Sequence, residues 1–348
     1  MGEPLRRENL SPQSAVAPHA DQMIRIERNI VLAARVRYRI GGRARYFCEP
    51  QNPGDIEDAV RWAISENVPF FFLGAGTNVL FPETGYDGLV MQYAATEIRE
   101  EPGGILLSAG TPMAEAVDYC TERGIRDLAW AGGLPGTVGG AVFGNAGCFG
   151  GEMKDSVLEV ESIAFDRASG NIERRVRSAA ACRFGYRESV FKRPDGEIVT
   201  AVLIRATPGD PAAVRAEVDS YIEHRRRFHP LDYPSAGSTF KNIPLASVSD
   251  EIRRDFAGVV KVDPSPIIPV AAVLDRLGLK GTRIGGAEIS AKHPNFFINR
   301  GKATFADISR LISLAKTMAW QRYGIVLEEE IRIVGGSSSF IGGENLDK

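Results

Sequence analysis

A run of small residues in the middle of the chain, residues 131–151, constrains the fold most strongly; it reads AGGLPGTVGGAVFGNAGCFGG. Nine of the 37 glycines lie in it. Glycine inside a helix or strand costs about 0.5–1 kcal/mol relative to alanine, so this run is a poor interior for a regular element. It suits a backbone that winds closely around a flat or charged ligand and turns bare N–H groups toward it. The alternative, a long flexible loop, is disfavoured by the apolar residues Leu134, Val138 and Phe143.

The length, composition and net charge of the chain exclude several classes of protein. A hydrophobic content of 44% and a charged content of 25% are ordinary for a soluble globular protein, and 348 residues give room for two or three domains. The formal charge of −2 announces neither a nucleic-acid nor a membrane partner. No apolar run reaches the ~20 residues of a membrane span, and the N-terminal segment lacks an apolar signal core. We therefore expect a cytoplasmic protein, as a monomer or weak oligomer.

Metal and disulfide chemistry are not indicated either. The four cysteines lie far apart and form no C-x-x-C pair, which argues against a zinc site or a disulfide framework. The four histidines make no pair with metal-ligand spacing.

Hydrophobic periodicity divides the chain into three blocks of mixed helix and strand. The first block has short strands within 23–50, a helix over 54–66 and strands at 69–73 and 88–91. In the second block, we expect a strand at 105–108, a helix with Thr111 as N-cap, and strands at 157–165, 171–177 and 197–206. The third block has helices at 211–227, 269–277 and 304–322, the last with Thr304 as N-cap, and a strand at 326–334.

These blocks give the predicted domain boundaries. Residues 1–22 are expected to be a flexible arm and residues 336–348 a flexible tail. Gly209-Asp210 and Pro211 mark a boundary, so the first two blocks, at about 23–93 and 94–210, are separated from a third block at 211–335.

Two common nucleotide-binding motifs are excluded. Gly74-Ala75-Gly76 follows a predicted strand, but a dinucleotide fingerprint would need glycine where Val79 stands. No G-x-x-x-x-G-K-[ST] sequence occurs, so there is no P-loop. Two glycine loops in neighbouring blocks still favour one large anionic cofactor lying between them.

Three spots carry candidate chemical groups. Arg187 follows the aromatic Tyr186, and a planar guanidinium there suits recognition of a carboxylate or diphosphate; a surface arginine on a strand is the alternative. Ser238 lies in a turn of small residues that lacks the G-x-S-x-G pattern, so a proton donor fits better than a hydrolase nucleophile. Glu328-Glu329-Glu330 suits a strand poorly; one of them is either held beside an arginine for acid work or part of a charged edge strand.

Taken in order, these segments resemble the UDP-N-acetylenolpyruvoylglucosamine reductases, the flavoenzymes of peptidoglycan precursor synthesis. The motifs that carry the resemblance are Arg39-Ile40-Gly41-Gly42, Leu73-Gly74-Ala75-Gly76-Thr77-Asn78, Gly133-Leu134-Pro135-Gly136-Thr137-Val138-Gly139-Gly140-Ala141, Asn145-Ala146-Gly147, Phe184-Gly185-Tyr186-Arg187, Pro234 to Asn242, Gly281 to Ala287, Asn295 to Asn299 and Leu327 to Ile331. They cover about residues 24–335 in family order.

The resemblance implies a fold and a reaction. It implies the fold class α+β, with a two-subdomain FAD-binding domain of the vanillyl-alcohol-oxidase type over 23–210 (subdomains about 23–93 and 94–210). A C-terminal domain over 211–335 would close the substrate site. FAD would be bound non-covalently, NADPH would be the hydride donor, and the substrate would be a UDP-sugar carrying an enolpyruvyl group. The product would be UDP-N-acetylmuramate, a precursor of the cell wall.

The resemblance also assigns residues. It implies Arg187, Ser238 and Glu330 as catalytic, with Arg187 and Glu330 stabilising an enolate-like state and Ser238 giving the proton. It implies substrate contacts at Tyr186, Asn242 and, in the cluster of residues 225–227, Arg225. The implied cofactor contacts are Arg39, Ile40, Gly41, Gly74, Ala75, Gly76, Thr77, Asn78, Pro135, Gly136, Thr137, Gly139, Gly140, Asn145 and Gly147. About fifty residues separate Arg187 from Ser238, which resembles the branch without an extra tyrosine-bearing loop.

Two other interpretations remain at this point. A related flavin oxidase acting on a sugar or alditol would often tether its flavin through a histidine after R-x-G-G, where this chain has Arg43. A non-catalytic sugar-nucleotide-binding relative would bind no flavin. The chain departs from the usual family pattern at Val36-Arg37, at Phe228-His229 and at Cys148.

Overall fold

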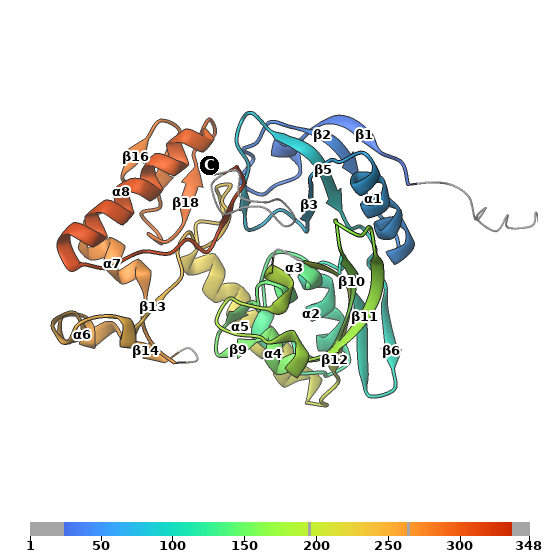
Figure 1. The fold of residues 1–348 in the computed structure, drawn as a ribbon. Helices are drawn as coiled ribbons and strands as arrows, with labels where there is room; N and C mark the ends of the chain where they lie inside the picture. Colours follow the sequence, from blue (N-terminus) through green and yellow to red (C-terminus); the bar gives the residue numbers. More distant parts are fainter. Residues whose placement is uncertain (1–23, 194–195, 263–264, 336–348) are drawn as a thin grey trace, which may run out of the picture.

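The computed structural model describes residues 24–193, 196–262 and 265–335. The arm expected over 1–22 and the tail expected over 336–348 lie outside the described residues. Three bodies are visible in Figure 1: the first subdomain in blue, the second subdomain in green, and the C-terminal part in orange and red beside the first.

The first subdomain is a four-stranded mixed sheet in the order β1-β2-β5-β3. Its strands are β1 (Glu27–Val31), β2 (Arg43–Cys48), β3 (Phe70–Leu73) and β5 (Tyr86–Gln92), and β4 (Val79–Leu80) lies outside this sheet. Helix α1 (Pro53–Ser65) begins at Asn52, whose side chain accepts a hydrogen bond from the Asp55 N–H. The buried residues of α1 are the apolar stripe expected from the sequence, and α1 covers one face of the sheet (Figure 1).

The second subdomain is built on a five-stranded antiparallel sheet in the order β11-β10-β12-β7-β6. The strands are β6 (Ile98–Glu101), β7 (Gly104–Ser108), β10 (Val157–Phe165), β11 (Ile172–Ser178) and β12 (Glu197–Arg205). Its helices are α2 (Met113–Glu122), α3 (Val138–Phe143), α4 (Met153–Ser156) and α5 (Pro211–Phe228), and β8 (Gly147–Cys148) pairs with β9 (Gly151–Glu152).

The C-terminal part combines two small antiparallel sheets with helices α6 (Asp250–Phe256), α7 (Val270–Arg276) and α8 (Phe305–Tyr323). The strands are β13 (Ile243–Pro244), β14 (Lys261–Val262), β15 (Pro266–Ile268), β16 (Arg283–Ile284), β17 (Ala287–Ile289) and β18 (Phe297–Asn299). Helix α8 begins at Thr304 with the expected capping box to Asp307. Strand β19 (Arg332–Ile333) returns to the first subdomain and runs parallel to β4.

The two faces of the first sheet belong to different cores. Because side chains alternate along a strand, Phe70 and Leu89 pack under α1 with the second subdomain, whereas Phe71 and Val90 pack against the C-terminal part. The first sheet is therefore shared between the two cores.

Three expectations about local structure are corrected. Thr111 is not the cap of α2: the N-cap is Pro112, and the buried Thr111 hydroxyl has no hydrogen-bond partner. Residues 326–334 form a strand only at 332–333, because residues 328–330 make only an isolated antiparallel bridge, between Glu329 and Phe240. The glycine stretch contains a helix, α3, which begins at Thr137 and tolerates its glycines because Val138, Ala141 and Val142 are buried.

The start of the C-terminal domain also moves. We predicted it at residue 211, but Val214 and Val218 of α5 belong to the core of the second subdomain. By packing, α5 completes the cofactor-binding domain, so we propose the boundary after α5 instead.

Candidate active site

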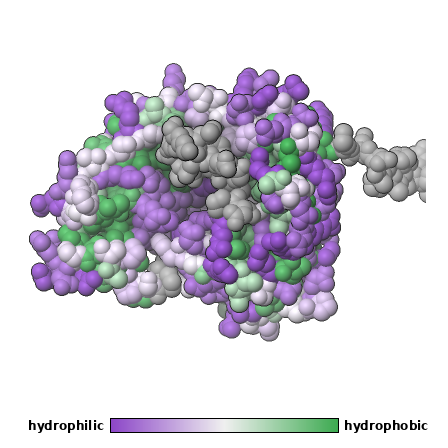
Figure 2. Space-filling view, in the orientation of Figure 1, coloured by the Kyte–Doolittle hydropathy of each residue, from purple (hydrophilic) through white to green (hydrophobic). Residues whose placement is uncertain are grey.

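One large cavity of about 730 Å³ lies where the three bodies meet. This volume is within the range of ligand-binding pockets. Its walls come from the loop after β3, the glycine stretch, the end of α5 and the loop before β13. On the face drawn in Figure 2 the surface is hollowed between the C-terminal part and the two subdomains, with hydrophilic residues in the hollow.

The two glycine loops form one side of this cavity. A Cβ on Gly76, which has φ +64, would lie 2.5 Å from the Arg35 carbonyl oxygen, and a Cβ on Gly139 would lie 2.6 Å from the Ala109 Cβ. Larger residues would therefore push these loops out of place. In residues 75–78, backbone N–H groups make no hydrogen bond to any described protein group. Such a loop can present its N–H groups to an anionic ligand.

Most of the expected cofactor residues line the cavity. They are Gly74, Ala75, Gly76, Thr77, Asn78, Pro135, Gly136, Thr137, Gly139, Gly140 and Gly147. Four do not. Arg39 points to solvent, Ile40 is buried in the core shared with the C-terminal part, a Cβ on Gly41 would meet Phe81, and the fourth is Asn145. Arg37 lines the cavity in their place, and its N–H donates to the Gly76 carbonyl over 2.9 Å.

Asn145 does not line the cavity but supports it. It is fully buried, its Nδ2 donates to the Gly185 carbonyl over 2.9 Å, and its Oδ1 accepts from the Lys154 N–H over 3.0 Å. Asn145 thus ties the glycine stretch to the turn that carries Arg187.

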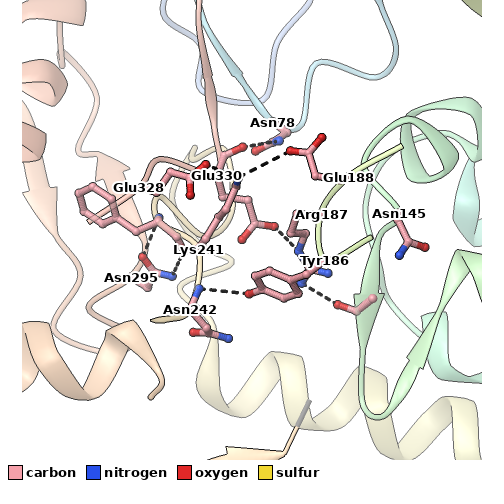
Figure 3. A network of polar contacts seen from close by, with 12 residues as sticks. Asn78, Asn145, Tyr186, Arg187, Glu188, Lys241, Asn242, Asn295, Glu328 and Glu330 are labelled. Carbon is pink, nitrogen blue, oxygen red and sulfur yellow. Dashed lines mark hydrogen bonds and ion pairs between the residues drawn. The ribbon is translucent and has the colours of Figure 1, made fainter. Parts of the chain in front are cut away.

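Arg187 and Glu330 meet across the cavity, as Figure 3 shows. The Arg187 Nε donates to Glu330 Oε1 over 2.7 Å, and an Arg187 Nη donates to the Gly147 carbonyl over 2.9 Å. Burial is the largest single effect and disfavours the charged guanidinium, but the charge and hydrogen bond of Glu330, together with Tyr186 and Cys148, outweigh it, so the pKa of Arg187 is raised. Arg187 has a left-handed backbone with φ 54°, a conformation that is strained for a residue other than glycine.

The backbone of Glu330 is held from both sides. Its N–H donates to the Thr239 carbonyl over 2.8 Å, and Asn78 Nδ2 donates to its carbonyl over 3.0 Å. Ser238 therefore lies one residue from a direct contact of Glu330, and it lines the same cavity. All three expected catalytic residues come together although they lie on three different segments.

The expected substrate residues have different positions. The Asn242 N–H donates to the Tyr186 hydroxyl over 3.1 Å, and this pair lies beside the cavity rather than in its lining (Figure 3). Arg225 does line the cavity, and its Nε donates to the Gly132 carbonyl over 2.9 Å while an Nη approaches Cys148 Sγ at 2.9 Å. Arg225 thus braces the glycine stretch.

Further titratable residues of the lining were not among the expected site residues, and they include Lys192, His229, His293 and Arg332. Lys192 donates to the Arg187 carbonyl, and burial lowers the pKa of its amino group. The rings of His229 and His293 lie 5.5 Å apart at the opposite end. Phe228-His229 was visible as a departure from the family pattern, but no local pattern distinguishes Lys192 from a surface lysine.

The charge of the cavity suits an anionic ligand. Its described lining carries six cationic side chains, Arg37, Arg187, Lys192, Arg225, Lys261 and Arg332, against the carboxylates Glu197 and Glu330. Among the described residues no cluster of His, Cys, Asp or Glu could hold a metal ion. In the same part of the chain, no helix has the length and apolar character needed to span a membrane.

Comparison with known proteins agrees with this arrangement. Residues 44–174 match the model of an FAD binding domain, and residues 229–334 match that of the UDP-N-acetylenolpyruvoylglucosamine reductase C-terminal domain. The UDP-N-acetylenolpyruvoylglucosamine reductase of a Synechococcus strain is 35% identical over 89% of this chain and 92% of its own length. That of Chloroflexus aurantiacus is 36% identical over 87% of this chain and 95% of its own length.

A solved structure shows the same fold over most of the chain. The crystal structure of UDP-N-acetylenolpyruvylglucosamine reductase from Thermus caldophilus has a TM-score of 0.70 and is 26% identical, covering 89% of this chain and 99% of that one. The predicted α+β fold, an FAD-binding domain followed by a C-terminal domain, is confirmed.

Proposed function

Because the chain belongs to the UDP-N-acetylenolpyruvoylglucosamine reductase family, we propose that it uses NADPH to reduce the enolpyruvyl group of UDP-N-acetylglucosamine enolpyruvate to the lactyl ether of UDP-N-acetylmuramate. Family membership makes it an FAD-dependent oxidoreductase of peptidoglycan precursor synthesis. The choice of NADPH, the non-covalent attachment of FAD, the cytoplasmic location and a monomeric or weakly oligomeric state are parts of this proposal.

The observation that best supports it is the meeting of Arg187, Glu330 and Ser238 in a cavity whose other side is two glycine loops. The loops fit FAD, because the N–H groups of residues 75–78 have no partner among the described residues and there is no room for a side chain at Gly76 or Gly139. Residues 74–78 and 135–140 would hold the diphosphate. When bound, FAD supplies hydride transfer between the nicotinamide donor and the substrate double bond.

Arg187 and Glu330 act on the charge that the substrate develops. An enol ether accepts hydride only if its carboxylate takes up the developing negative charge, and a preorganised cation stabilises that charge. Glu330 and Gly147 fix the Arg187 guanidinium for this purpose. In this proposal Glu330 stands beside the substrate carboxylate that Arg187 binds and helps to stabilise the enolate-like state.

Ser238 completes the addition by giving a proton to the substrate carbon that receives no hydride. Its hydroxyl lines the cavity and is partly exposed, so water can return the proton afterwards. Because a single serine hydroxyl donates this proton, the proton reaches one defined face of the substrate carbon.

Substitution of Ser238 tests the proposal. In anaerobic stopped-flow experiments, Ser238→Ala should leave flavin reduction by NADPH nearly intact and slow flavin reoxidation by the enolpyruvyl substrate by about 10²–10⁴-fold. Ser247→Ala, outside the cavity with its hydroxyl bonded to the Pro244 carbonyl, is the matched control and should change neither rate. Equal loss in both half-reactions would refute the proton-donor assignment.

The wild-type protein tests the activity itself. It should be purified yellow, release intact flavin on acid precipitation, and, without oxygen, oxidise more than one NADPH per flavin only when the enolpyruvyl sugar nucleotide is present. A covalently attached flavin with oxygen uptake on sugars or alditols would favour an oxidase instead, and a colourless protein that binds no FAD would indicate a non-catalytic relative.

A further inference from the structure

Arg332 occupies a position that the assigned roles do not use. It lies on β19, where its backbone N–H donates to the Asn78 carbonyl over 3.0 Å and its Cα pairs with Val79 of β4. Its backbone is thus fixed to the end of the loop at residues 74–78, and it lies two residues after Glu330. It therefore stands where the cofactor side of the cavity meets the Arg187–Glu330 pair.

Its side chain lies between two aromatic rings and lines the cavity. The guanidinium carbon lies 4.5 Å from the centre of the Phe71 ring and 5.1 Å from that of Phe143. Phe71 belongs to β3 and Phe143 ends α3, so both rings are on elements of the cofactor-binding domain. Two rings hold the planar group in one orientation.

The Arg332 guanidinium differs from Arg187 and Lys192 in having no acceptor among the described residues. Throughout residues 24–193, 196–262 and 265–335, no carboxylate or carbonyl oxygen makes a hydrogen bond or ion pair with it. Arg187 is bonded to Glu330 and Gly147, and Lys192 lies 3.7 Å from a Glu188 carboxylate oxygen.

The charge on Arg332 persists at neutral pH. Burial lowers the pKa of Arg332 to about 10, which still leaves the side chain protonated at pH 7. A partly buried cation without an acceptor is costly, and contact with ring faces offsets only part of that cost. An anionic ligand would supply the missing acceptor.

We propose that Arg332 binds an anionic oxygen group of the molecules held in this cavity, belonging either to the cofactor or to the carboxylate of the substrate. The inference rests on the proposed function for the identity of these two molecules. It adds a third cationic residue to the reaction end of the cavity, one whose donors are all free for the ligand. The planar guanidinium suits a two-oxygen contact that a lysine could not reproduce.

The test compares Arg332→Gln, which keeps the length of the stem and removes the charge, with the wild-type protein. Two probes are titrated at low and high salt: FAD into the apoprotein, followed by quenching of flavin fluorescence, and the enolpyruvyl sugar nucleotide into the oxidised holoenzyme, followed by the flavin spectrum. We expect one of the two dissociation constants to rise about 10- to 100-fold, with a weaker salt dependence than in the wild type. A change for FAD assigns the anion to the cofactor, and a change for the sugar nucleotide assigns it to the substrate.

Two further variants keep the result interpretable. Arg322→Gln removes an exposed arginine of α8 that lies over the Tyr323 ring outside the cavity, and it should bind both probes as the wild type does. Arg332→Lys keeps the charge but lacks the planar group, so it should bind the affected probe more weakly than the wild type and more tightly than Arg332→Gln. If Arg332→Gln is too unstable to titrate, Arg332→Lys is compared with the wild type alone.

The outcomes separate this inference from the proposed function. If the wild type binds both probes and both Arg332 variants bind them equally tightly at both salt concentrations, with only a lower melting temperature, Arg332 is structural and the inference is wrong. If the wild type binds neither FAD nor the sugar nucleotide, the proposed function fails and the inference with it.

Discussion

The C-terminal part meets the two subdomains of the cofactor-binding domain in opposite ways. Against the first subdomain it forms one continuous apolar core that includes Phe71, Phe81, Phe240 and Phe297. No described residue of the second subdomain or of α5 belongs to that core. The contacts there are polar or aromatic, as in the Arg187–Glu330 pair and the contact between Lys241 and Glu188 at 3.7 Å (Figure 3).

This difference explains where the site lies. Separating the apolar boundary would expose buried hydrocarbon, at about 25 cal/mol per Å². Separating the polar boundary exchanges its hydrogen bonds and ion pairs for contacts with water, which changes the free energy much less. A cavity that must admit one ligand after another is better placed at the second kind of boundary.

The largest effect is expected at the apolar boundary. Phe297 is fully buried on β18, and its backbone carbonyl accepts a hydrogen bond from the Tyr38 hydroxyl of the first subdomain over 2.8 Å. Phe297→Ala should lower the free energy of unfolding by about 3–5 kcal/mol, as cavities in packed cores do. Denaturant unfolding of the flavin-loaded protein measures this. Phe228→Ala, at an exposed phenylalanine, should change it by less than about 0.5 kcal/mol, and equal losses would contradict the contrast.

At the polar boundary, substitution should affect chemistry more than stability. Arg187→Met is expected to slow flavin reoxidation by the substrate by about 10²–10³-fold, because it removes the cation that faces the developing charge. Its loss of melting temperature should be smaller than that of Phe297→Ala. Arg183→Met is the matched control, since Arg183 is exposed and has the same left-handed backbone with φ 49°. If Arg187→Met leaves the rate of flavin reoxidation unchanged, the Arg187–Glu330 ion pair takes no part in the reaction.

A smaller effect should appear with pH at the end of the same boundary. Burial lowers the pKa of His229 to about 3 and that of His293 to about 4, so both are neutral in the folded protein, while the unfolded chain protonates them near 6.5. Their contribution to the free energy of unfolding is therefore complete above pH 6.5 and is lost as the pH falls from 6.5 toward the pKa values of the folded protein. Between pH 6.5 and 5 the loss should be about 1–2 kcal/mol for each histidine.

The double variant His229→Gln, His293→Gln checks this window. Its free energy of unfolding should vary less between pH 6.5 and 5 than that of the wild type. The carboxylate Glu197 does not interfere, because its arginine and serine partners outweigh burial and lower its pKa to about 2, so it titrates below this range. If the free energy of unfolding falls equally with pH in the two proteins, the histidines are not responsible.

Much of the fold was predictable because it follows from the local spacing of apolar residues. The stripes of α1 and α8 and the strand over 157–165 follow from apolar spacing, and the Thr304 cap from the capping box. The position of α5 was missed, because an amphipathic helix does not say which neighbour covers its apolar face. Strand β19 is shorter than predicted, because the alternation of side chains along residues 326–334 does not show where the backbone pairs with a neighbouring strand.

The site was predictable in its parts but not in its assembly. The ordered motifs indicated Arg187, Ser238 and Glu330, but only the structure gives the 2.7 Å contact between two of them. Arg39 and Ile40 were expected at the cofactor, yet neither lines the cavity, since Arg39 is exposed and Ile40 is buried in the core shared with the C-terminal part. Arg332 showed no local signal, since its significance depends on two rings and on the absence of a protein acceptor among the described residues.

The pairing of β19 with β4 has a consequence for how the protein is made. Asn78 and Glu330 are hydrogen-bonded although they lie 252 positions apart, so the ribosome must finish nearly all of the described chain before they meet. Until then, the emerging first subdomain has the Phe71 face of its sheet uncovered, and a chaperone that shields apolar surface has a defined segment to protect. Translation that stops before residue 330 leaves a nascent chain that contains both glycine loops but lacks Glu330.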